Sequence, residues 1–71
     1  MKKSEKATRF AKALECERLE RGMTHQEFSN FLGIPRSSVT TYLLARSLPG
    51  AKRLKIISKK LNLDIVKILV N

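Results

Sequence analysis

Hydrophobic residues recur along much of the chain at intervals of three and four, the spacing that lines one face of an α-helix. Between about Glu5 and Arg21 this interval joins Phe10, Ala13 and Leu14, and most of the other residues there are good helix formers. No stretch alternates apolar and polar residues in the manner of a half-buried strand. The pattern therefore predicts an all-α protein.

Three glycines and two prolines divide the chain into pieces of helical length. Gly22 follows the first piece, in the position where a left-handed residue commonly ends a helix. Later breaks fall at Gly33 to Pro35 and at Pro49 to Gly50. Beyond them we expect a fourth helix from Ala51 to Asn62 and a short fifth helix from Ile65 to Val70. The sequence thus predicts five helices.

The second piece begins with a capping box formed by Thr24 and Glu27. The Thr24 hydroxyl can accept from the N–H of Glu27, and the Glu27 carboxylate can accept from the N–H of Thr24. Met23 before the cap and Phe28 behind it can form a hydrophobic staple. We therefore expect a helix that starts directly after Thr24 and stops at Gly33.

The third piece is predicted to begin at Pro35, because proline at the first helical position removes only an N–H that has no helical partner. Its apolar residues recur at helical intervals and define an inward face: Val39, Tyr42 and Leu43. Its polar residues lie on the other faces and are expected to point outward: Arg36, Ser37, Thr40 and Thr41. Serine and threonine are mediocre helix formers, so helix stability does not explain this outward face.

The junction between the second and third pieces has the residues of a tight helix-turn-helix. Two helices that cross steeply through a short turn must meet with little bulk between them. This requires a small residue on the first helix, a glycine in the turn and a β-branched apolar residue on the second. Ser29, Gly33 and Val39 occupy these positions and are the predicted packing residues.

The net charge of the chain indicates which class of partner it can bind. The formal net charge of +9 in 71 residues favours anionic partners, such as nucleic acid or an anionic membrane surface. Five of the six acidic residues lie at or before Glu27, whereas residues 28–63 contain seven Lys or Arg and no Asp or Glu. One half of the molecule is therefore expected to carry nearly unopposed positive charge.

Several other classes of protein are disfavoured. The single cysteine, Cys16, allows no intrachain disulfide and suits a reducing compartment. No apolar run follows the first lysines as in a signal peptide, and no stretch approaches the roughly 18 apolar residues of a membrane-spanning helix. The only histidine, His25, has no partner at a recognised metal-ligand spacing, and no nucleophile–base set is present. We expect one non-enzymatic domain over residues 1–71, cytoplasmic and associated with the nucleoid, without cofactor, metal, small-molecule ligand or membrane partner.

Four short motifs follow one another with regular gaps: Gly-Met-Thr-x-x-Glu-Phe-Ser at 22–29, Leu-Gly-Ile at 32–34, Arg-Ser-Ser-Val at 36–39, and Leu-x-x-x-Ile-Val near the end. Together they resemble the helix-turn-helix family of the Cro and phage-repressor type, over about residues 9–70. The resemblance implies a five-helix, lambda-repressor-like DNA-binding domain with its helix-turn-helix at residues 25–45.

The resemblance also implies which residues touch DNA. In that family the third helix enters the major groove, and the second helix crosses above it with its N-terminus against a phosphate. Base reading is thereby assigned to Pro35, Arg36, Ser37, Thr40 and Thr41. Arg36 can bind a guanine through O6 and N7, and the threonine methyls can meet a thymine methyl. Phosphate binding is assigned to Thr24, His25, Gln26, Arg46, Lys52 and Arg53, with residues 1–5 as a flexible basic arm.

Two positions depart from the family's pattern. Many members pair an arginine of helix one with a glutamate near the end of helix three. Arg18 matches the arginine, but Leu43 stands in place of the glutamate, so Arg18 is either exposed or bound to Glu15 or Glu27. The common Glu-Asn-Gly after helix three is replaced by residues 43–45, Leu-Leu-Ala, and the asparagine that would meet a phosphate is missing.

The resemblance further implies a two-fold dimer on DNA, with half-sites about one helical turn apart. We expect a Cro-like phage or prophage repressor of a palindromic operator, controlled by its own abundance because the chain stops at Asn71. The dimer-interface candidates are the apolar residues of the last helix, which Asp64 can cap: Ile65, Ile68, Leu69 and Val70. Two alternatives stay open, a protein-interaction or antitoxin-like module of the same fold and non-specific nucleic-acid binding through charge alone.

Overall fold

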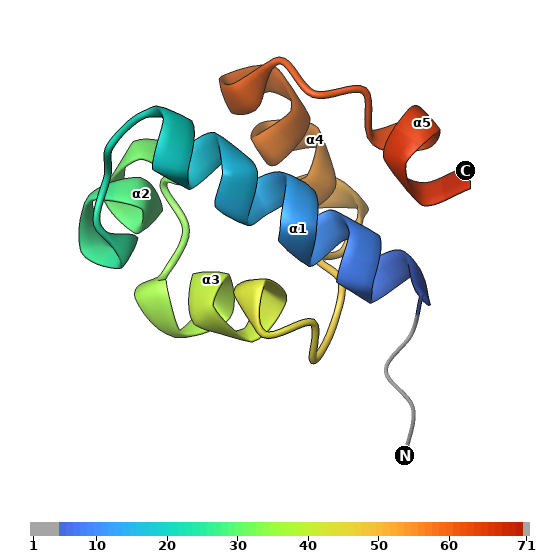
Figure 1. Ribbon diagram of the computed structural model, residues 1–71, viewed down its shortest axis with the longest axis horizontal. Helices are drawn as coiled ribbons and strands as arrows, with labels where there is room; N and C mark the ends of the chain where they lie inside the picture. The colour runs from blue at the N-terminus through green and yellow to red at the C-terminus, as the bar shows by residue number, and fades with distance from the viewer. Residues whose placement is uncertain (1–4, 71) are drawn as a thin grey trace.

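Five α-helices and no strand make up the part of the protein that the computed structural model describes, residues 5–70. They are α1 (Glu5–Glu20), α2 (His25–Leu32), α3 (Arg36–Leu43), α4 (Ala51–Leu61) and α5 (Ile65–Val70) (Figure 1). The all-α, five-helix prediction is confirmed. The predicted basic arm falls mainly on residues 1–4, which lie outside the described residues, and its last residue, Glu5, belongs to α1.

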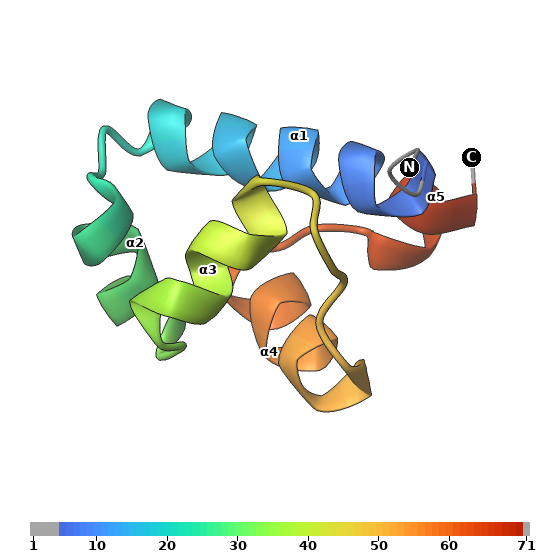
Figure 2. The same ribbon diagram turned by 90° about the horizontal axis from the view of Figure 1, so that it is seen from below.

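The longest helix, α1, packs against both α3 and α5, while α2 packs against α3 and α4. Figure 2 shows α1 along one side of the molecule, with α2, α3 and α4 on the other and α5 beside the N-terminal half of α1. The two helices of the predicted helix-turn-helix therefore pack against each other, and α1 packs against the second of them, α3.

One hydrophobic core joins these elements. The Phe10 ring of α1 meets the Tyr42 ring of α3 edge-on, with the ring centroids 6.3 Å apart. The buried residues of the core are Phe10, Leu14, Phe28, Leu32, Ile34, Val39, Tyr42, Ile57 and Leu61. Because Val39 and Tyr42 occupy the inner face of α3, the opposite face of this helix is left to solvent.

The turn between α2 and α3 depends on the backbone of Gly33. This residue has φ 70° and ψ 32°, in the left-handed region. Its N–H donates to the carbonyls of Ser29 and Asn30 at 2.9 and 3.2 Å, which ends α2. A Cβ placed on Gly33 would meet nothing within 4 Å beyond its chain neighbours. The prediction that glycine is needed to make room between the helices is therefore wrong in its reason, because it is the positive φ that requires glycine.

The start of α3 also differs from the prediction by one residue. Pro35 has φ −55° and ψ 140°, so it is not itself helical. Its carbonyl accepts from the N–H groups of Ser38 and Val39 at 3.0 and 3.1 Å, as a residue directly before a helix does. The first helical residue is therefore Arg36.

At the other end of α3, Ala45 adopts a left-handed backbone with φ 58°. The common family pattern has glycine at this position, so the chain keeps a glycine-like conformation with an alanine. The Ala45 N–H donates to the Tyr42 carbonyl at 3.0 Å, and the N–H of Arg46 donates to the Thr41 carbonyl at 3.1 Å. These bonds end α3 and direct the chain toward α4.

Arg18 ties the end of α1 to the turn before α2. Its Nε and Nη2 donate to the two carboxylate oxygens of Glu15 at 2.5 and 3.0 Å, and its Nη1 donates to the Met23 carbonyl at 2.7 Å. The hydrogen bond from Arg18 holds the pKa of Glu15 below its ordinary value. Of the environments left open for Arg18, the structure selects Glu15.

Candidate nucleic-acid interface

The outer face of α3 carries most of the predicted base-reading residues. Pro35, Arg36, Ser37 and Thr40 are exposed, while Val39 on the opposite face is fully buried. Arg36 is the first residue of α3, and within residues 5–70 its side chain takes part in no hydrogen bond or ion pair. Its guanidinium is therefore available to a ligand beside the start of α3.

Thr41 differs from the other predicted base-reading residues, because it is only partly exposed. Its hydroxyl donates to the Ser37 carbonyl one turn earlier, at 2.9 Å. This internal bond uses the hydroxyl hydrogen. Thr41 can consequently offer a methyl group or an accepting lone pair, whereas Thr40 can offer a donor as well.

The N-terminus of α2 has the predicted capping box. Thr24 Oγ1 accepts from the Glu27 N–H at 3.1 Å, and Glu27 Oε1 accepts from the Thr24 N–H at 2.9 Å. The Thr24 N–H is thus occupied, and the Glu27 carboxylate places negative charge at the same end of the helix. The N–H groups of His25 and Gln26 begin the helix and have no helical carbonyl partner, so they are the donors left for a phosphate.

The side chain of Gln26 forms hydrogen bonds within α2. Its Nε2 donates to Ser29 Oγ at 3.3 Å and to Asn30 Oδ1 at 3.1 Å. Ser29 is only 2 % exposed, and its hydroxyl donates to the Gln26 carbonyl at 2.8 Å. The side chain of Gln26 therefore covers the buried serine of the helix-turn-helix, and only its main-chain N–H points to a role toward phosphate.

The cations after α3 fall into two groups. Arg46 and Lys52 are exposed. Arg53 is partly buried, and its Nη1 donates to Ser38 Oγ at 2.9 Å and to the Tyr42 hydroxyl at 3.0 Å. Arg46 and Lys52 are therefore open to solvent, whereas Arg53 is turned toward α3.

The dimer candidates on α5 whose side chains the structure describes differ in whether they pack against the hydrophobic core. Ile65 and Leu69 pack against the hydrophobic core, and Ile68 is half-buried. The side chain of Val70 lies outside the described residues. Among the described side chains of α5, Val66 is the most exposed large apolar one, at 70 %. Sequence reasoning missed it because α5 is too short for its inward face to be identified without its neighbours.

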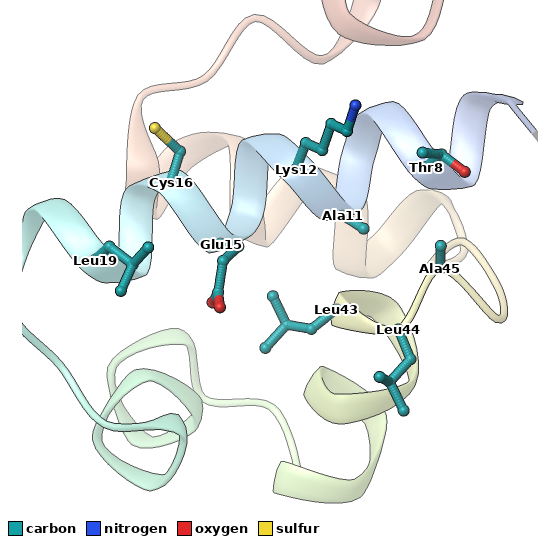
Figure 3. A pocket seen from close by; sticks show the side chains of 9 residues that line it. All are labelled: Thr8, Ala11, Lys12, Glu15, Cys16, Leu19, Leu43, Leu44 and Ala45. Carbon is teal, nitrogen blue, oxygen red and sulfur yellow. The ribbon is translucent and has the colours of Figure 1, made fainter.

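An open apolar groove of about 540 Å³ lies between α1 and the end of α3. Figure 3 shows Leu19 and Cys16 of α1 on one side and Leu43 and Leu44 on the other. Leu19 and Leu44 are 61 % and 44 % exposed. The Cys16 thiol donates to the Glu20 carboxylate at 3.4 Å, and this hydrogen bond raises the pKa of Cys16. The cysteine is therefore a poor nucleophile near neutral pH.

The described side chains contain no group of three or more His, Cys, Asp or Glu that could hold a metal ion. None of the helices within residues 5–70 has the length and apolar character needed to cross a membrane. What the described surface does offer is an exposed polar face on α3, with two exposed cations, Arg46 and Lys52, in the residues that follow this helix.

Comparison with known proteins agrees with this arrangement. Neither the curated proteins nor the solved structures contain a match to the chain. A family model described as helix-turn-helix matches residues 14–68, from the middle of α1 to α5. Because the match covers most of the chain, the protein belongs to the helix-turn-helix family of the Cro and phage-repressor type, whose members are DNA-binding regulators.

Proposed function

We propose that the protein is a sequence-specific repressor of the Cro or prophage type, which binds a palindromic operator in double-stranded DNA as a dimer. The observation that carries the proposal is the division of α3 into a buried face and an exposed polar face. Arg36, Ser37 and Thr40 can reach base edges while Val39 holds the helix in the core. Such a helix can enter the major groove without disturbing the fold.

Base reading begins with Arg36. An arginine at the start of the recognition helix can donate two hydrogen bonds to O6 and N7 of a guanine. Ser37 and Thr40 each supply a hydroxyl that can donate to or accept from a neighbouring base. The methyl of Thr41 suits contact with a thymine methyl.

Phosphate binding sets the register of α3 on the duplex. The N–H groups of His25 and Gln26 lie at the positive end of the α2 dipole. Arg46 and Lys52 follow α3 in the chain and are exposed, so they supply cations in addition to the N–H donors of α2. The absence of acidic residues from 28 to 63 leaves the positive charge of this region without local opposition.

A dimer is proposed because one recognition helix reads only a few base pairs, which gives little specificity. The exposed apolar side chain of Val66 on α5 supports a contact between two copies there. Ile65 and Leu69 support α5 from beneath because they pack on the core. Two copies related by a two-fold axis would read a palindrome.

The test is selection of duplexes from a random library by the purified protein at about 150 mM salt, where charge-driven binding is partly screened. We expect an enriched motif with two-fold symmetry. Arg36→Ala should relax the motif at one guanine and reduce discrimination there by about 1–3 kcal/mol. Arg46→Ala is the matched control, and it should weaken binding to all sequences equally. Binding without enrichment would refute the proposal and favour non-specific binding through charge.

A second candidate function is favoured by the exposed leucines of the groove between α1 and α3, Leu19 and Leu44. An apolar groove of this kind suits a protein partner, as in an interaction or antitoxin-like module. Leu19→Ser should then abolish a specific protein complex and leave DNA binding unchanged. Absence of DNA binding by the wild-type protein would bring this candidate forward.

A further inference from the structure

Arg53 is a partly buried cation that contacts a neighbouring helix. It projects from the first turn of α4, yet its guanidinium lies against the side of α3. A single nitrogen, Nη1, donates to both Ser38 Oγ and the Tyr42 hydroxyl, at 2.9 and 3.0 Å. Ser38 and Tyr42 are four residues apart, so they lie one turn above the other on the same side of α3.

The partners of Arg53 are neutral hydroxyls. The ion pairs found among the described residues all lie between residues 5 and 21, in α1 and the residue that follows it, and residues 28–63 contain no Asp or Glu. The contact therefore does not neutralise the positive charge of Arg53. A planar guanidinium is suited to this arrangement, because it presents several donors in a fixed geometry that a lysine lacks.

The Arg53 bridge, meaning its hydrogen bonds to Ser38 and Tyr42, links α3 and α4, two helices that have few other contacts. The helix pairs in closest contact within residues 5–70 are α1–α3, α1–α5, α2–α3 and α2–α4. Arg53 joins α3 to α4, which is not one of these pairs. The Tyr42 ring in turn packs edge-on against Phe10 of α1. Arg53, Tyr42 and Phe10 thus form a continuous connection from α4 through α3 to α1.

This connection acts on the helix proposed to read DNA. Ser38 lies between Ser37 and Val39, and its partner Arg53 therefore restrains α3 next to the exposed face. Rotation of α3 about its axis would break both hydrogen bonds at once. The same rotation would move Arg36, Ser37 and Thr40 away from the bases that they are proposed to contact.

We propose that Arg53 is a positioning residue for DNA recognition, which fixes the rotation of α3 through Ser38 and Tyr42 and does not contact a phosphate. The proposal rests on the proposed function, since it assigns a task within the same interface. It replaces the phosphate contact that the family resemblance implies for this residue. Lys52, the preceding cation, retains the phosphate contact.

A phosphate contact and a positioning contact at Arg53 predict different salt dependences of DNA binding. Loss of a phosphate contact reduces the slope of log binding constant against log salt by about 1 and weakens binding to all sequences. Loss of a positioning contact leaves the slope unchanged and reduces the preference for the selected duplex over a scrambled one. We expect a loss of preference of about tenfold, the order of one misplaced bidentate base contact.

The sharpest variant is Tyr42→Phe, which removes only a hydroxyl and keeps every charge. Tyr42 is 6 % exposed and lies on the inner face of α3, so its hydroxyl can affect DNA only through Arg53 and the position of the helix. Arg53→Lys also keeps the charge but loses the guanidinium geometry. Both variants are expected to lose sequence preference with an unchanged salt slope. Lys52→Met is the matched control, with preference intact and a slope reduced by about 1.

The experiment measures binding of each variant to the selected and scrambled duplexes across a salt series, and thermal unfolding of Arg53→Met, Tyr42→Phe and their double variant without DNA. Non-additive unfolding free energies together with lost preference support the proposal. Additive free energies, or an Arg53→Lys variant that keeps full preference, would overturn it. A wild-type protein with no sequence preference would refute the proposed function and the recognition role of Arg53, while the unfolding data would still report whether the bridge exists.

Discussion

Replacement of Gly33 by alanine tests the reason for which this turn contains a glycine. At φ 70° and ψ 32° an alanine places its Cβ close to its own carbonyl oxygen, at a cost of about 1–2 kcal/mol. The surroundings add no steric cost, because a Cβ at this position meets no atom within 4 Å beyond its chain neighbours. Alanine also restricts the unfolded chain, which offsets about 0.4–1 kcal/mol of that cost. The net loss of stability is therefore expected to be about 1 kcal/mol.

The assay is thermal and urea unfolding followed by helical circular dichroism. For a chain of this size, about 1 kcal/mol corresponds to a Tm lower by roughly 4–8 °C. Gly33→Asn is the matched control, because asparagine tolerates the left-handed region better than alanine does. Asparagine should lose less stability than alanine although its side chain is larger.

The opposite order would refute this reasoning. If Gly33→Asn were more destabilising than Gly33→Ala, the size of the side chain would govern the loss, and the two helices would be too close for a side chain at this position. A loss above about 3 kcal/mol for alanine would lead to the same conclusion, since backbone conformation alone does not account for it.

Three further predictions concern the cap, the Glu15 ion pair and α5. Thr24→Ala should lower the free energy of unfolding by about 1 kcal/mol in a urea titration, because it removes the hydroxyl that accepts from Glu27; an unchanged midpoint would show that the cap contributes nothing. Glu15→Gln should destabilise the protein above the ordinary carboxyl pKa of 4.5, and the difference from wild type should disappear as pH falls through the lowered pKa of folded Glu15. Unfolding measured from pH 7 to pH 2 would contradict this if the difference persisted in acid. Val66→Lys should weaken self-association in sedimentation experiments and leave Tm unchanged, because the side chain is 70 % exposed, and an unaltered dimer would place the contact elsewhere.

Much of the local structure was predictable because it depends on residues a few positions apart. The capping box joins Thr24 to Glu27 within one turn, and its two hydrogen bonds appear in the structure as the sequence indicates. The five helices follow from apolar intervals of three and four, together with the glycines and prolines between them. Their ends differ from the predicted ones by at most about one residue, as at Pro35.

The candidate site was predictable only in part. The exposed face of α3 follows from the spacing of polar residues around buried Val39, so Arg36, Ser37 and Thr40 could be named from the chain alone. The internal bond of the Thr41 hydroxyl could not, because an exposed threonine on a helix can donate to its own backbone or to a ligand.

The sequence by itself determined the class of fold, the family and the face of α3 that meets solvent, because these depend on short-range periodicity and on motif order. Tertiary structure decided the partners of the long cationic side chains. Arg18 had more than one carboxylate in reach, and only the path of the α1–α2 turn selected Glu15 and the Met23 carbonyl. Arg53 reaches hydroxyls on another helix, and no short-range pattern encodes how two helices are placed side by side.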